Sequence, residues 1–171
     1  MKFYLTLFII LTAANSFPVA AVEQATTDRL NEVERLGRHV MPFDLNQTVH
    51  VFSKTADGGV QKVISKKPSN KSQITLIRKH LKKIAAEFKQ RNFTDPTKIH
   101  GKDMPGLNAL KHAKPGSILI QYRKLENGAE ITYSTKASSL ISAIHKWFDA
   151  QLSDHARHAT KGHPHHIMHN Q

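Results

Sequence analysis

Hydrophobic and polar residues alternate along two stretches of the chain, and a glycine-containing turn interrupts each stretch. The first stretch runs from Val49 to Ser65 around Asp57-Gly58-Gly59, and the second runs from Ile118 to Thr135 around Glu126-Asn127-Gly128. Alternation with a period of two is typical of strands, and Asp-Gly and Asn-Gly favour tight hairpins because the turn needs positive φ angles. The pattern therefore predicts two β-hairpins.

A segment with apolar residues three or four positions apart follows each hairpin. We expect helices from Gln73 to about Gln90 and from about Ser138 to His155, each with one apolar face. The two faces consist of Ile74, Ile77, Leu81, Ile84 and Phe88, and of Leu140, Ile141, Ile144, Phe148 and Leu152. The chain is therefore predicted to be α+β, with a duplicated ββα unit that gives a four-stranded, mostly antiparallel sheet with helices packed on one face.

The flanking segments differ from this central part. Residues 48–157 are predicted to form the duplicated domain, and residues 22–47 form an N-terminal arm that contains a helix from about Thr27 to Gly37. Residues 158–171 form a histidine-rich tail without apolar periodicity, which we expect to be disordered. The sequence leaves open whether the N-terminal arm packs on the domain.

Residues 1–21 have the three parts of a cleavable secretory signal peptide. Lys2 provides the positive start, an apolar stretch of 12 residues runs from Phe3 to Ala14, and Val19-Ala20-Ala21 supplies small residues for cleavage. This stretch is shorter than the roughly 20 residues of a membrane span. The chain has no cysteine, which excludes a lipoprotein anchor and any disulfide. We therefore expect a periplasmic or secreted protein of 171 − 21 = 150 residues.

The chain is strongly basic, with a formal net charge of +12 at pH 7. Arg78, Lys79, Lys82 and Lys83 gather on the first long helix, where they could bind an anionic polymer or a membrane surface. The alternative is a helix face that is merely solvated. Aromatic residues do not alternate with these charges and no nucleic-acid-binding motif is recognisable, so a specific nucleic-acid partner is not expected.

Histidine is concentrated at the C-terminus, where six of the 12 histidines lie in the last 17 residues. The candidate metal ligands are His155, His158, His163, His165, His166, Met168 and His169. Imidazole suits copper and zinc, and a thioether adds a preference for Cu⁺. The tail is therefore predicted to capture or deliver copper or zinc, and the alternative is a polar tail that binds metal only in vitro.

A second candidate site lies in the long connector between the two repeats, from Asn92 to Pro115. The connector is rich in glycine and proline and contains a short predicted helix from Leu107 to Ala113. Long connectors of this kind often carry function. His100 and Asp103, with Met104 beside them, could share a ligand or a proton. The alternative is a structural turn in which Asp103 caps the short helix.

The last predicted helix adds two His–carboxylate pairs, His145 with Asp149 and Asp154 with His158. Members of each pair are four residues apart, which places them on one helix face. Such a pair can orient an imidazole for metal binding or acid–base chemistry. The alternatives are an exposed ion pair and, for His145, a partly buried position at the edge of the core.

Four segments carry a family resemblance: Val51 to Gln61, Gln73 to Leu81, Ile99 to Leu107, and His145 to His155. Together they resemble a family of small exported bacterial proteins often labelled aspartate carbamoyltransferase. The resemblance covers Val49 to His155 and implies the compartment and the fold. The activity in the label needs a phosphate-binding loop of the Ser-Thr-Arg-Thr type and two full α/β domains. The chain has neither, so carbamoyltransferase activity is not expected.

These patterns predict an exported small binding protein, with transition-metal ions as its ligands, rather than an enzyme. One alternative is an uncharacterised periplasmic enzyme that uses the loop of His100 and Asp103. The other is a basic module that binds an anionic polymer or a membrane surface. Nucleophilic catalysis has little support, because the sequence lacks cysteine, a G-x-S-x-G turn and an HExxH helix.

Overall fold

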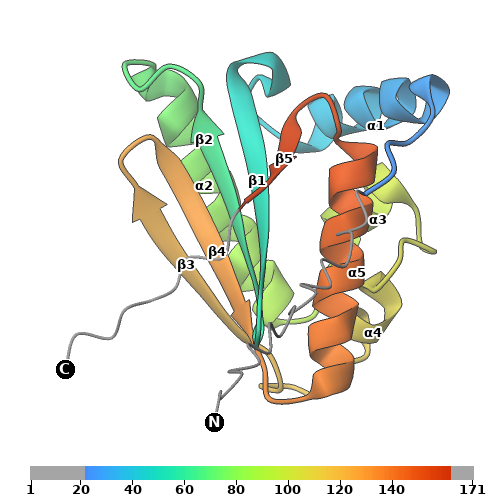
Figure 1. The fold of residues 1–171 in the computed structure, drawn as a ribbon. Coiled ribbons are helices and arrows are strands. Elements are labelled where there is room, and N and C mark those ends of the chain that lie inside the picture. The colour runs from blue at the N-terminus through green and yellow to red at the C-terminus, as the bar shows by residue number, and fades with distance from the viewer. Residues whose placement is uncertain (1–21, 163–171) are drawn as a thin grey trace, which may run out of the picture.

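The computed structural model describes residues 22–162, which form an α+β domain (Figure 1). In chain order its elements are α1 (Thr27–Val40), the 3₁₀ helix η1 (Leu45–Gln47), β1 (Thr48–Thr55), β2 (Gly58–Ser65), α2 (Lys71–Lys89), α3 (Thr94–His100), α4 (Leu107–Lys111), β3 (Leu119–Leu125), β4 (Gly128–Ser134), α5 (Ser138–Asp154) and β5 (Ala159–Lys161). The predicted α+β class, both hairpins and both long helices are confirmed. Among the described helices, none has the length and hydropathy needed to cross a membrane.

The sheet has five strands in the order β3-β4-β2-β1-β5 and is mixed. The β1–β2, β2–β4 and β3–β4 pairs are antiparallel, whereas β5 pairs with β1 in parallel. The prediction of four strands was therefore wrong by one edge strand. The fifth strand is only three residues long and its partner lies more than 100 residues earlier, so no local pattern announces it.

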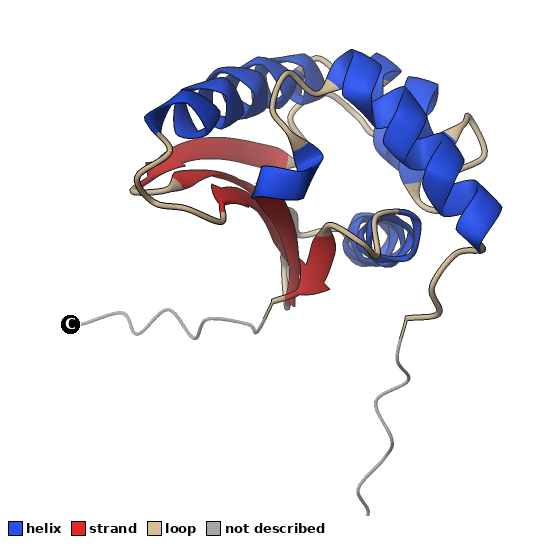
Figure 2. Cartoon of the chain, turned by 90° about the horizontal axis from the view of Figure 1, so that it is seen from above, coloured by secondary structure: helices blue, strands red, loops and turns tan. Residues whose placement is uncertain are grey.

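The helices lie on one side of the sheet, and the core fills the space between them (Figure 2). Helix α2 packs on β4 and β3, whereas α5 packs on β2 and β1. Each long helix therefore covers mainly the hairpin of the other half of the chain. Three of the largest buried side chains, Trp147, Phe148 and Tyr133, meet where α5 faces the centre of the sheet.

The N-terminal arm packs on the domain. Thr26 caps α1 by accepting a hydrogen bond from the backbone of Arg29. Helix α1 packs on α3 and α5, and its residues Leu30 and Val33 are buried. Phe43 and Leu45, which follow α1, also lie in the core. The arm is thus part of the same hydrophobic unit, and it carries Arg29 to the end of α5.

The C-terminal tail departs from its prediction at its start. Residues 158–171 were predicted to be disordered, but Ala159–Lys161 form β5 and Gly162 donates a backbone hydrogen bond to Phe52. Backbone pairing with the edge of β1 supplies the order that this polar sequence lacks by itself. Residues 163–171, with most of the histidine-rich sequence, lie outside the described residues.

The long connector folds into two short helices. Helix α4 confirms the predicted helix after Leu107, whereas α3 was not predicted. Gly106 joins the connector to α5 with a left-handed φ of +78°, and a Cβ placed on it would lie 2.1 Å from the carbonyl oxygen of Ala143. Glycine therefore allows the connector to touch α5, and this contact fixes α3 and His100 over the core.

Candidate functional site

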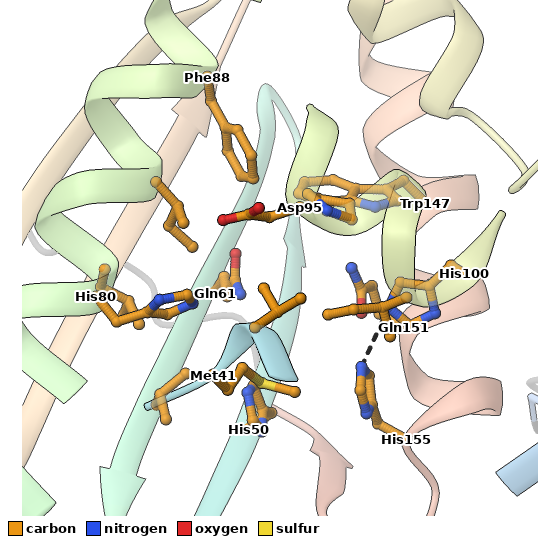
Figure 3. Close-up of a pocket in the computed structure, with 16 residues that line it drawn as sticks. Met41, His50, Gln61, His80, Phe88, Asp95, His100, Trp147, Gln151 and His155 are labelled. Carbon is orange, nitrogen blue, oxygen red and sulfur yellow. Dashed lines mark hydrogen bonds between the residues drawn. The ribbon is translucent and has the colours of Figure 1, made fainter. Parts of the chain in front are cut away.

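A small cavity of about 50 Å³ lies between the sheet and the helices α2, α3 and α5 (Figure 3). Its walls combine apolar side chains with an unusual number of polar ones. The polar groups that line it include His50, His80, His100, His155, Gln61 and Asp95. Four imidazoles from β1, α2, α3 and the end of α5 therefore converge on a single small space.

The imidazoles are held in the neutral form by burial. Burial lowers the pKa of His50 to about 3 and that of His80 to about 4. It also lowers the pKa of His155 well below the usual value, and the pKa of His100 below it despite the opposing effect of Asp154. All four rings thus keep a lone pair on one nitrogen at neutral pH.

Asp154, the last residue of α5, organises one side of the site. Its Oδ2 lies 2.7 Å from Nδ1 of His100, and Arg29 donates to its two oxygens at 3.2 and 2.7 Å. Arg29 also donates to the carbonyl oxygen of His100 at 2.9 Å. Burial alone would raise the pKa of Asp154, but the hydrogen bonds from His100 and Arg29 bring it below the usual range.

The network continues inward from His100 to His155. Their Nε2 atoms are 3.2 Å apart, and the rings are nearly perpendicular, with an interplanar angle of 84°. Because the Asp154 carboxylate accepts the Nδ1 proton of His100, the Nε2 of His100 carries the lone pair. It therefore accepts a hydrogen bond from the Nε2–H of His155.

His50 lies next in this series, on β1. Its ring stacks on that of His155 with centroids 5.5 Å apart, and the backbone N–H of His50 donates to the carbonyl of His158 at 2.8 Å. His50 and Trp147 both line the cavity, and the Nδ1 of His50 and the Nε1 of Trp147 are buried without a hydrogen-bond partner within the described part of the chain. Buried polar atoms of this kind normally bind something, so they indicate an occupant for the cavity.

An open groove of about 570 Å³ lies on the other side of His100. Four of the five residues predicted for the connector and last-helix site line it: His100, Asp103, Met104 and Asp149. The side chain of His100 is only 1% exposed, so it forms the wall between groove and cavity. Arg29 and Asp154 also line the groove, which connects this surface to the buried histidines.

His145, the fifth predicted residue, lies elsewhere. Its Nε2 is 3.0 and 2.9 Å from the carbonyl oxygens of Thr55 and Gly58, so it holds the β1–β2 turn against α5. Asp149, its predicted partner, instead contacts Lys54 at 2.6 Å. The arrangement corresponds to the predicted core-edge position of His145.

The predicted tail ligands are divided between the network and other places. His155 belongs to the network, whereas the Nε2 of His158 lies 3.7 Å from Glu34 of α1, and neither of its ring nitrogens has a hydrogen-bond partner among the described residues. The others, His163, His165, His166, Met168 and His169, lie outside the described residues. Within residues 22–162, no group of three or more His, Asp or Glu side chains is placed to hold one metal ion.

Three contributors were missed at the sequence level: Arg29, His50 and His80. Two of them left a detectable signal. His50 alternates with Phe52 on the buried side of β1, and His80 falls within the apolar face of α2 between Ile77 and Leu81. A histidine at a core position in a regular pattern was therefore the informative feature.

Comparison with known proteins identifies no relative from which the role of this site could be inferred. No protein-family model matches the chain, and neither a curated protein nor a solved structure matches it. The resemblance in Val49 to His155 thus stays a prediction, and the functional residues are identified from the geometry alone.

Proposed function

We propose that this chain is a small exported binding protein whose ligand is a transition-metal ion, copper or zinc. The observation that carries the proposal is the presence of four neutral imidazoles in the lining of one small cavity, with Met41 beside them. Nitrogen and thioether ligands suit copper and zinc, whereas Mg²⁺ and Ca²⁺ prefer oxygen. The partnerless nitrogens of His50 and Trp147 support a polar occupant.

Export is supported by the three-part pattern of residues 1–21. Because the chain has no cysteine, it must bind a metal ion without thiolate ligands. The buried histidines of the domain are the alternative ligands that this chain offers. The histidine-rich residues after Gly162 would then act in first capture of the ion.

The proposal is tested by metal content and by stability. The protein purified from its cells is incubated with Zn²⁺ or Cu²⁺, freed of excess ion, and analysed for bound metal. Because a ligand at 100 times its Kd stabilises a protein by about 2.7 kcal/mol, an excess of the ion should also raise the urea midpoint. Mg²⁺ is the control and should do neither. Absence of retained zinc and copper, with unchanged stability, would reject the proposal.

Acid–base catalysis is the second candidate function. It is favoured by the 2.7 Å contact between His100 and Asp154, next to a groove that also contains Asp103. The buried ring of His100 would have to reach the groove by movement of the connector. Acid–base catalysis would be favoured if Asp154→Asn abolished the turnover of a substrate while Asp149→Asn retained it.

Binding of an anionic surface is less well supported, because two of the basic side chains on α2 already contact groups of the chain itself. Arg78 donates to the carbonyl oxygens of Leu125, Glu126 and Gly128, and Lys83 pairs with Asp95 and Glu87. These two charges already bind groups of the chain itself. Lys79 and Lys82 are the members of the predicted basic face left for such a partner.

We also propose that the two hairpin–helix halves arose by duplication. The two hairpins have the same register after a shift of 128 − 58 = 70 residues, because Thr55 opposite Gly58 becomes Leu125 opposite Gly128. The central β2–β4 pair follows the same rule. Gly58 lies opposite Ser134 and Gly128 lies opposite Ile64, and a shift of 70 residues relates Gly58 to Gly128 and Ile64 to Ser134. Two-fold symmetry of this kind supports one repeated unit.

A further inference from the structure

We propose that His100 and His155 bind one tetrahedral metal ion, Zn²⁺ or Cu⁺, through their Nε2 atoms at the edge of the cavity. This inference rests on the proposed function and locates its site. It places the ion in the folded domain, where two ligands come from segments 55 residues apart, and not in the tail that composition singles out.

The distance between the two nitrogen atoms fits a shared ion. Two nitrogen ligands at about 2.0 Å from a tetrahedral metal are about 3.3 Å apart. The Nε2 atoms of His100 and His155 are 3.2 Å apart. The rings meet edge to face at 84°, with centroids 4.8 Å apart, so their Nε2 atoms can point to one position without a clash between the rings.

Asp154 supplies the outer support that metal-binding histidines normally have. A ligating histidine usually donates its other ring N–H to a carboxylate, which fixes the tautomer and the ring orientation. His100 makes this contact to Asp154 at 2.7 Å, and Arg29 holds the carboxylate in place through both of its oxygens. His100 is thus oriented with its Nε2 lone pair directed at His155.

Metal binding requires one proton to change position on His155. Without metal, the Nε2–H of His155 donates to the Nε2 of His100. When the ion binds, this proton transfers to Nδ1 of His155, so that both Nε2 lone pairs face the ion and both rings stay neutral. The hydrogen bond between the rings is replaced by two metal–nitrogen bonds, with no net release of protons from this pair.

The cavity provides room for the remaining ligands of the ion. A tetrahedral ion held by two histidines keeps two positions for water or another small ligand. The cavity of about 50 Å³ is large enough for a few water molecules. Water bound there could hydrogen-bond to the partnerless nitrogens of His50 and Trp147, two residues that line the same space. The proposed ion therefore accounts for polar atoms that otherwise have no partner.

The test uses Co²⁺ as a coloured substitute for Zn²⁺ in the full protein. The prediction is one equivalent of Co²⁺ with the intense visible absorption of a tetrahedral site, displaced by Zn²⁺. His155→Gln should lose the absorption, and Asp154→Asn should weaken binding by about 10–100-fold. A variant with His163, His165, His166 and His169 all changed to Gln keeps the signal, as does His112→Gln on the exposed surface.

The outcomes separate this inference from the proposed function. If the tail variant loses the bound ion and His155→Gln keeps it, the buried site is wrong while metal binding stands. If neither the natural protein nor any variant binds Zn²⁺, Cu²⁺ or Co²⁺, both the buried site and the proposed metal-binding function are wrong. Should His155→Gln fail to fold, ¹⁵N NMR of the natural protein decides. Zn²⁺ must shift Nε2 of both His100 and His155, and unchanged shifts would overturn the site.

Discussion

Replacing Asp154 with asparagine should destabilise the metal-free protein by about 3 kcal/mol. The side chain is 14% exposed and accepts three hydrogen bonds, from Nδ1 of His100 and from Nε and Nη2 of Arg29. Asparagine keeps the shape but not the charge. The buried N–H of His100 then loses a charge-assisted partner, which costs about 1.5–3 kcal/mol. Arg29 is partly exposed and is rehydrated, so it adds about 1 kcal/mol at most.

Asp149→Asn is the matched control on the same helix. Asp149 also pairs with a cation, Lys54, at 2.6 Å, but it is 40% exposed and forms no hydrogen bond with a histidine of residues 22–162. An exposed ion pair is worth about 0–1 kcal/mol, so this variant should unfold close to the natural protein.

Urea denaturation in the presence of a chelator measures both variants. With a slope of about 2 kcal/mol per molar urea, the midpoint of Asp154→Asn should fall by about 1.5 M, against less than about 0.5 M for Asp149→Asn. Equal shifts for the two variants would refute the assignment of Asp154 as the centre of a buried network that joins α1, α3 and α5.

Three further predictions concern other parts of the fold. Folded His80 stays neutral down to its pKa of about 4, whereas the unfolded residue gains a proton below 6.5, so stability is lost as pH falls through this window. His80→Leu should therefore reduce the pH dependence of the free energy of unfolding between these values by about 1.4 kcal/mol per pH unit. Equal pH dependence in the variant and the natural protein would contradict this. In Gly106→Ala the new Cβ meets the backbone of α5, so the free energy of unfolding should fall by about 3 kcal/mol. Gly101 has a similar φ, but open space surrounds the position of its Cβ, so Gly101→Ala should cost only about 1–2 kcal/mol, as measured by thermal unfolding. Arg78→Gln should cost about 1–2 kcal/mol through lost bonds to three carbonyls, and Lys79→Gln less than about 0.5 kcal/mol; similar urea midpoints would contradict the difference.

The hairpins and long helices were predictable because their signals are local. Alternation, tight-turn glycines and a 3.6-residue period all act over a few neighbouring residues, and tertiary packing did not override them. Strand β5 was not predictable, because it depends on the edge of β1, which lies far away in sequence. The parallel pairing at that edge also turns the start of the tail into part of the sheet.

The site was predictable only in part. His100, Asp154 and His155 all drew attention in the sequence, but Asp154 was paired with His158 by the four-residue rule of helices. That rule fails here because α5 ends at Asp154, so His158 is no longer on the helix. The real partners, His100 and Arg29, are 54 and 125 residues away. Only the packing of α1 and the connector on α5 brings them together.

A crystal structure of the protein grown with Zn²⁺, with anomalous data collected at the zinc edge, tests the central claim most directly. The account predicts one anomalous peak at the cavity edge, about 2.0 Å from Nε2 of both His100 and His155, with Asp154 still bonded to Nδ1 of His100. A cavity that holds only water, with the His100–His155 hydrogen bond unchanged and zinc bound elsewhere or nowhere, would contradict it.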